Sequence, residues 1–150
     1  PYTTLFRSSQ KLLEIIGADI RQDCDDYLRL RELMQELYRC LAQRDASRVE
    51  QLNQQIAALI DAADGRATRR SKILSAFRLE QGPAGMQKLL ASYPQSQRDS
   101  LQSAWQQLGE LAAECKRLNA RNGKLLAAQH DILNQLLGGG EAQLYTPQPY

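Results

Sequence analysis

The side chains best suited to act as nucleophiles, bases or metal ligands in this 150-residue sequence are three cysteines and one histidine. Cys24, Cys40 and Cys115 are widely spaced and form no CxxC pair, which predicts buried thiols in a reducing cytoplasm rather than a disulfide framework or a zinc site. His130 stands beside Asp131, and we expect it to lie in solvent on the flank of a helix. No zinc-protease, P-loop or nucleophile-elbow motif accompanies it. The sequence therefore predicts no catalytic residue, no metal and no other cofactor.

Two clusters of opposite charge are the next candidates for a binding function. The acidic cluster consists of Asp19, Asp23, Asp25 and Asp26, and the basic cluster consists of Arg66, Arg69, Arg70 and Lys72. The basic cluster could bind phosphate or nucleic acid. However, the net charge of the chain is only +2, which does not indicate a general nucleic-acid binder. We favour the interpretation that the two clusters neutralise each other on neighbouring helices.

The composition indicates which elements carry these residues. Leu, Ala and Gln together make up 60 residues, whereas Val, Ile and Thr make up only 12. This bias favours helices and excludes an extensive sheet. No proline occurs in residues 2–82 or 95–146, so long helices are expected there. No apolar run reaches the length of a membrane span and no secretory signal is visible, so membrane insertion is not expected.

Heptad spacing predicts a helical hairpin in the first half of the chain. The first seam is Leu13, Ile16, Ile20, Asp23, Tyr27, Leu30, Met34, Leu37 and Leu41. The second seam is Val49, Leu52, Ile56, Leu59, Ala63, Arg66, Arg70, Ile73 and Phe77. If the chain turns near Asp45, the seams match and Asp23 meets Arg66. Ser47 and Glu50 have the spacing of a capping box for the second helix.

The second half predicts one short and one long helix. Gly82 to Gly85 are expected to end the second helix, and a short apolar face follows at Met86, Leu89, Leu90 and Tyr93. The third seam is Leu101, Ala104, Leu108, Leu111, Cys115, Leu118, Asn122, Leu125, Gln129, Ile132 and Leu136. We therefore predict an all-α fold, an antiparallel coiled-coil-like bundle of three long helices plus one short connecting helix.

The predicted bundle occupies residues 9–138 and forms the domain. Gly138 to Gly140 should stop the last helix, so residues 139–150 are expected to form a flexible tail. Residues 1–8 differ in composition from the rest and correspond to one reading frame of a common sequencing-adapter oligonucleotide. We interpret them as a suspected non-native segment and leave them out of the functional interpretation.

Asn122 and Gln129 are unusual because they interrupt an otherwise apolar seam. An unpaired amide at such a position costs about 1–3 kcal/mol. One interpretation is a device that fixes the register of the bundle, as buried Asn does in coiled coils. The other is that this part of the helix extends beyond the hairpin and presents a surface to a partner. The periodicity supports both interpretations equally.

The same stretch resembles a known family. Leu118-Asn119-Ala120-Arg121-Asn122-Gly123-Lys124-Leu125-Leu126, followed by Gln129, is similar to the LNxxNGxLL motif of the FlgN family of flagellar export chaperones. Trp105 precedes the motif and Leu144-Tyr145 follows it in the order found in that family. The specific signal lies in residues 105–145.

The resemblance implies a cytoplasmic chaperone of the flagellar type III export system. Its clients would be the hook-filament junction proteins FlgK and FlgL, and its membrane partner would be the export-gate component FlhA. The client-binding residues implied are Leu118, Asn119, Asn122, Gly123, Leu125, Leu126 and Gln129. Leu144 and Tyr145 would dock at the gate. The chain alone is expected to be a monomer or a weak dimer, and the alternative is a homo-oligomeric coiled-coil scaffold without clients.

Overall fold

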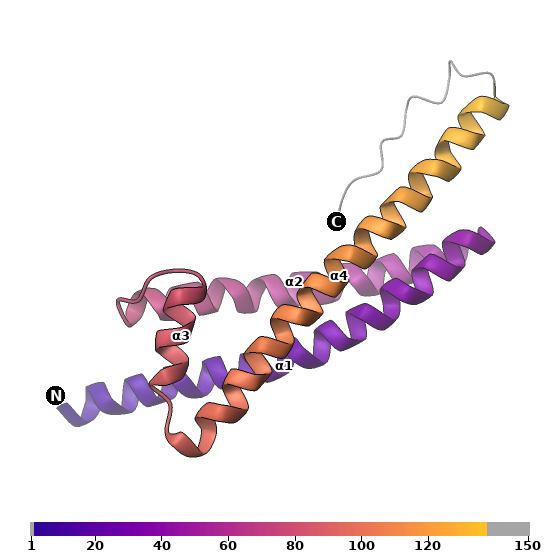
Figure 1. Cartoon of the computed structure of the whole chain (residues 1–150). Helices are drawn as coiled ribbons and strands as arrows, with labels where there is room; N and C mark the ends of the chain where they lie inside the picture. Colours follow the sequence, from indigo (N-terminus) through magenta and orange to yellow (C-terminus); the bar gives the residue numbers. More distant parts are fainter. Residues whose placement is uncertain (1, 138–150) are drawn as a thin grey trace.

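A computed structural model describes residues 2–137, with side chains from residue 4 onwards (Figure 1). It contains four helices, α1 (Tyr2–Gln43), α2 (Ala46–Ala76), α3 (Pro83–Ala91) and α4 (Gln95–Leu136). No strand occurs in these residues. The expectation of an all-α chain with three long helices and one short connecting helix is confirmed. The predicted tail, including Leu144 and Tyr145, lies outside the described residues.

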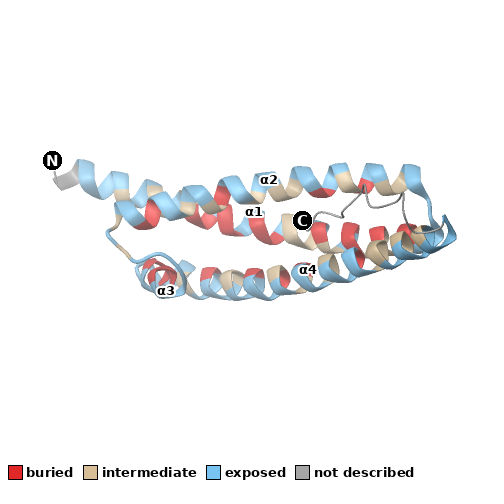
Figure 2. Ribbon diagram, turned by 90° about the horizontal axis from the view of Figure 1, so that it is seen from above, coloured by how far each residue is buried: buried red, intermediate tan, exposed pale blue. Residues whose placement is uncertain are grey.

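Helix α1 is the centre of the arrangement. It lies between α2 and α4 (Figure 2), and no Cα atom of α2 lies within 8 Å of one in α4. Helix α2 returns antiparallel to α1, as the seams predicted. Helix α4 runs in the same direction as α1, because Cys24 contacts Ala104 and Gln129 contacts Leu41. The long helices therefore run up, down and up, and both outer helices approach α1 more closely than they approach each other.

The turn between α1 and α2 is built without glycine or proline. Arg44 adopts a left-handed backbone with φ of 57°, and the Asp45 amide donates a hydrogen bond to the Cys40 carbonyl at 3.1 Å. This is the Schellman pattern, in which glycine is the usual left-handed residue. The predicted capping box at Ser47 and Glu50 is wrong, because the side chain of Asp45 is the cap and accepts from the Arg48 amide at 3.2 Å.

The expectation that Gly82 to Gly85 end the second helix is also wrong. Helix α2 ends six residues earlier, at Ala76, where Arg78 repeats the left-handed Schellman pattern of Arg44. Gly82, with φ of 89°, and Pro83 instead begin α3. A Cβ atom on Gly85 would lie 1.7 Å from the Glu80 carbonyl oxygen. The segment between α2 and α3 can therefore pack this closely on α3 only because residue 85 is a glycine.

The apolar interior forms two clusters. The first, at the end closed by α3, contains Ile16, Ile20, Ile73, Leu74, Met86, Leu89, Leu90, Tyr93 and Leu101. The second, towards the hairpin tip, contains Leu30, Leu33, Met34, Leu37, Cys40, Leu41, Leu52, Ile56 and Cys115. The short apolar face predicted for α3 is thus buried. On α1, Asp19 lies among the residues of the first cluster and Asp23 lies between the two clusters, and both are buried.

Candidate functional site

The three cysteines are placed as core residues, as their types and spacing predicted. All three are free and buried. Burial raises the pKa of the Cys115 thiol to about 11, and burial together with Asp23 and Asp25 raises the pKa of Cys24. Because the thiolate is the reactive form, neither of these two thiols is set up as a nucleophile.

His130 is half-buried rather than in solvent as expected, and its Nδ1 lies 3.3 Å from the Asn134 side-chain nitrogen. Within residues 2–137, no three His, Cys, Asp or Glu side chains gather in a way that could hold a metal ion. In the same stretch, no helix has both the length and the apolar character to cross a bilayer.

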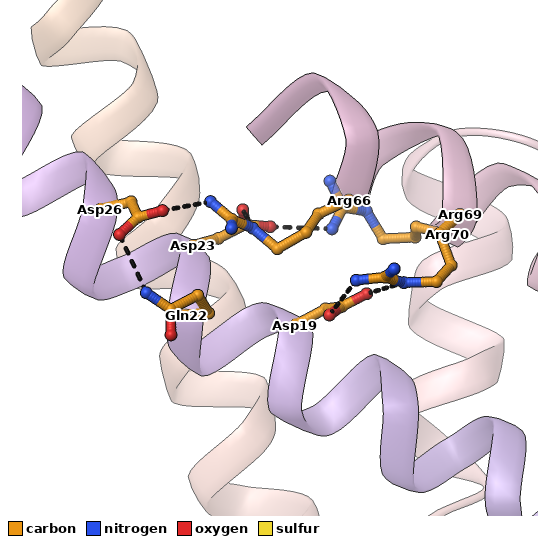
Figure 3. Close-up of polar contacts among 7 residues, drawn as sticks. All are labelled: Asp19, Gln22, Asp23, Asp26, Arg66, Arg69 and Arg70. Atoms are coloured by element: carbon orange, nitrogen blue, oxygen red, sulfur yellow. Dashed lines mark hydrogen bonds and ion pairs between the residues drawn. The ribbon is translucent and has the colours of Figure 1, made fainter. Parts of the chain in front are cut away.

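The two charged clusters meet in a partly buried network between α1 and α2 (Figure 3). Arg66 donates to both Asp23 and Asp26, the latter at 2.6 Å, and Arg70 donates to the second oxygen of Asp23 at 3.0 Å. Arg69 forms a two-fold contact with Asp19, with both distances at 2.7 Å. The predicted register, with Asp23 opposite Arg66, is confirmed.

The network has a structural role rather than a phosphate-binding one. Burial opposes the charge of Arg66, but the hydrogen bonds that Arg66 donates to Asp23 and Asp26, together with the charges of these carboxylates, outweigh it, so the pKa of Arg66 is raised. The guanidinium of Arg70 also lies over the ring of Trp105 on α4, 5.0 Å from its centroid. Arg66, Arg69 and Arg70 are thus neutralised by α1, whereas Asp25 and Lys72 are exposed and lie outside these contacts.

A ladder of side-chain hydrogen bonds joins α4 to α1. Asn122 donates to the Met34 carbonyl at 3.0 Å, and Gln129 donates to the Leu41 carbonyl at 2.6 Å. One heptad earlier, the Cys115 sulfur lies 3.6 Å from the Tyr27 carbonyl. Each contact joins residues 88 apart in the sequence. This constant offset supports the register interpretation of the two amides, which the periodicity left open.

One polar atom of the ladder lacks a hydrogen bond. Asn122 is 3% exposed, and its Oδ1 atom is buried without a hydrogen-bond partner among the described residues. A buried acceptor without a donor is destabilising. The amide therefore fixes the register of α4 at a cost that a leucine at the same position would not have.

The remaining motif residues border this contact. Leu118, Asn119, Leu125 and Leu126 are half-buried, and the three leucines pack against the apolar cluster at the hairpin tip. Gly123 is exposed, and a Cβ atom there would meet nothing within 4 Å. The fold thus gives no steric reason for a glycine in the middle of this helix, where it costs stability relative to alanine.

The end of α4 is the most unusual surface of the molecule, and the seam indicated only its apolar pattern. Figure 1 shows the last turns of α4 extending clear of the hairpin tip. Ile132, Leu133, Leu136 and Leu137 are between 48% and 78% exposed, and we call these four residues the exposed end. Leu136 lies one heptad after Gln129, but α1 ends at Gln43 and supplies no partner for it. The apolar face of α4 therefore extends beyond the part that α1 covers.

Comparisons with known proteins give one result. The family model described as FlgN protein matches residues 10–139, which is 130 of the 150 residues. Neither the comparison with curated proteins nor that with solved structures found a match. Because the family model spans most of the chain, including the hairpin, the ladder and the exposed end, the chain belongs to the FlgN family of flagellar export chaperones.

Proposed function

We propose that this protein is a cytoplasmic chaperone that binds the terminal helices of hook-filament junction proteins of the FlgK and FlgL type. Binding would cover the apolar faces of those helices and prevent their premature assembly. The chaperone would then deliver them to the export gate. Membership of the FlgN family supports the general chaperone role. The clients, the gate component FlhA and the location in the cytoplasm belong to the proposal.

The single observation that carries this proposal is the exposed end of α4. Its four side chains continue a heptad face that is covered by α1 up to Gln129 and uncovered from Ile132 onwards. A large apolar side chain contributes roughly 1.5–3 kcal/mol when it becomes fully buried. An amphipathic client helix placed beyond the end of α1 would bury these residues, as in helix-in-groove recognition.

The motif residues have two different parts in this proposal. Asn122 and Gln129 hold α4 on α1 and so set the direction in which the exposed end extends. Leu118 and Leu125 are half-buried seam residues and would extend the client surface back along α4, whereas the half-buried Leu126 would widen it beside the seam. Gly123 would allow a client backbone to come close, because its position is open. Asn119 lies on the same stretch and would border the contact.

The test is a double substitution at the exposed end. Ile132→Asn with Leu136→Asn should weaken binding of a purified FlgK-type protein at least tenfold, measured by calorimetry, and leave the melting temperature unchanged. The matched control is Ala113→Asn with Ala120→Asn, two exposed positions of the same helix on the side away from the apolar face. Client binding that is unaffected by the first pair, or lost equally with both pairs, would contradict the proposal.

The proposal separates client binding from delivery. Leu144 and Tyr145 are adjacent large residues in the segment after the triple glycine, and such a pair is suited to docking on a gate protein. Tyr145→Ala should leave helical content, melting temperature and client affinity unchanged and should lower export of the junction proteins. Loss of client affinity would instead place Tyr145 in the client surface, and normal export would remove its docking role.

A further inference from the structure

Two stripes of different chemistry run side by side along α4. Leu118, Leu125 and Ile132 repeat every seven residues; the two leucines are half-buried, and Ile132 is 48% exposed. Arg117, Arg121 and Lys124 have i, i+4, i+7 spacing, so they share one helix face, and Arg117 and Lys124 immediately precede two of the leucines. We call these three residues the basic stripe.

The basic stripe forms no ion pair with another described residue. All three residues are exposed, and no carboxylate oxygen of the described residues lies within 4.0 Å of their charged groups. Arg121 is held over the ring of Tyr38 on α1, 3.8 Å from its centroid, which fixes its direction without neutralising its charge. By contrast, the three arginines of the basic cluster on α2 are all paired with aspartates.

The position of the stripe indicates what it is suited to bind. In coiled coils, charged residues beside an apolar seam select partners whose flanking residues carry the opposite charge. The basic stripe occupies such a flanking position beside a seam that loses its cover towards the exposed end. An incoming helix that packs on Leu125 and Ile132 would therefore bring its own flanking residues close to Arg121 and Lys124.

Resting on the proposed function, we infer that the client helix is an acidic one: it carries Asp or Glu along one edge of its apolar face, and these residues pair with Arg117, Arg121 and Lys124. The occupant is a helix rather than a flat anionic surface, because the leucines beside the stripe follow a narrow heptad line. The basic stripe would select the client and set its register. The exposed end would supply most of the affinity, since surface ion pairs contribute little individually.

The experiment uses two synthetic amphipathic helices with the same leucine heptads. One peptide carries Glu at the positions flanking the seam, and the other carries Lys. Their affinities for the full chain are measured by fluorescence anisotropy at low and at physiological ionic strength. We expect the Glu peptide to bind about tenfold more tightly at low ionic strength, and the difference should shrink as salt is added.

Charge reversal tests the residues themselves. Arg117→Glu, Arg121→Glu and Lys124→Glu together should invert the preference between the two peptides. The matched control is Lys11→Glu, Arg21→Glu and Lys72→Glu, which makes the same change of charge at exposed positions on α1 and α2 and should leave the preference as it was. If the reversed variant does not fold, the triple glutamine variant of the same residues should abolish the preference without inverting it.

The outcomes separate this inference from the proposed function. Equal affinity for the two peptides, or no binding of either, would overturn the inference. So would binding of the basic stripe to anionic phospholipid vesicles without discrimination between the peptides, since that result would assign the stripe to a membrane surface. The proposed function would still stand if Ile132→Asn with Leu136→Asn lowered affinity for a FlgK-type protein, and it would fail if that pair had no effect.

Discussion

The two halves of α4 share one heptad seam but use it differently. The proximal half, residues 95–115, buries Leu101, Leu108, Leu111 and Cys115, whereas the distal half, residues 116–136, buries only Asn122. The charges differ too, because the proximal half has one basic and three acidic residues and the distal half has four basic and one acidic. An apolar seam thus stabilises the fold only where another helix covers it, and where the cover ends the same pattern leaves large apolar side chains exposed.

The largest expected effect contrasts one leucine from each half. Leu101 is 1% exposed and packs in the cluster closed by α3, so Leu101→Ala should lower the free energy of unfolding by about 2–5 kcal/mol. Leu136 is 78% exposed, so Leu136→Ala should change it by less than about 0.5 kcal/mol. Urea denaturation measures both. Similar losses at the two positions would mean that the distal half is part of the core.

Asn122 is the buried polar residue near the border between the two halves of α4, and two substitutions there should have different effects on stability. Asn122→Asp removes the donor to the Met34 carbonyl and buries a carboxylate, so it should destabilise the fold by about 2–3 kcal/mol. Asn122→Leu removes the unpartnered Oδ1 atom and should leave the stability equal or higher. Thermal unfolding of both variants checks this prediction. A destabilising leucine would show that the amide contributes net stability as well as register.

Burial of Cys115 in the proximal half should make the free energy of unfolding depend on pH. Its pKa rises from 9.0 to about 11 on folding, so the unfolded chain releases this proton at lower pH than the folded protein. The free energy of unfolding should therefore keep the full contribution of this group below pH 9 and should fall as the pH rises towards 11, by up to about 3 kcal/mol. Cys115→Ala should flatten this slope between pH 9 and 10. An unchanged slope would mean that other groups, such as Tyr93 with its pKa raised to about 12, dominate.

The smallest expected effect compares two glycines in equivalent open positions. A Cβ atom would meet nothing within 4 Å at either Gly109 or Gly123, so each Gly→Ala substitution should stabilise the chain by about 0.5–1 kcal/mol. Only Gly123→Ala should also weaken client binding, because Gly123 lies in the distal half. Calorimetry with a FlgK-type protein distinguishes the two variants. Equal client affinity would show that no client backbone approaches Gly123.

The hairpin was predictable from the sequence because its two apolar seams are interrupted by side chains of opposite charge at matching positions. The acidic Asp23 in one seam and the basic Arg66 in the other fixed the register, which the ion pairs confirm. The helix ends were not predictable, because Arg44 and Arg78 occupy left-handed positions that usually indicate glycine. The glycines at positions 82 and 85 therefore led us to expect the end of α2 too late in the chain, because the left-handed residue that ends it is Arg78.

The candidate site was predictable only as a stretch of sequence. A heptad seam specifies which face of α4 is apolar, but it does not specify which helix covers that face or where the cover ends. The end of the cover depends on the 88-residue offset between α1 and α4, which is a tertiary property. For this reason the motif pointed to Asn122 and Gln129, whereas the uncovered apolar residues lie further along, at Ile132 to Leu137.

The central claim is that clients bind the distal half of α4 while the rest of the fold stays as it is. Hydrogen exchange followed by mass spectrometry, on the full chain with and without a FlgK-type protein, tests this most directly. We predict rapid exchange of the amides near Ile132 to Leu137 in the free protein, slowing on client binding, with no change in residues 95–115 or in α2. Client-induced protection centred on α2 or on the proximal half of α4 would contradict it.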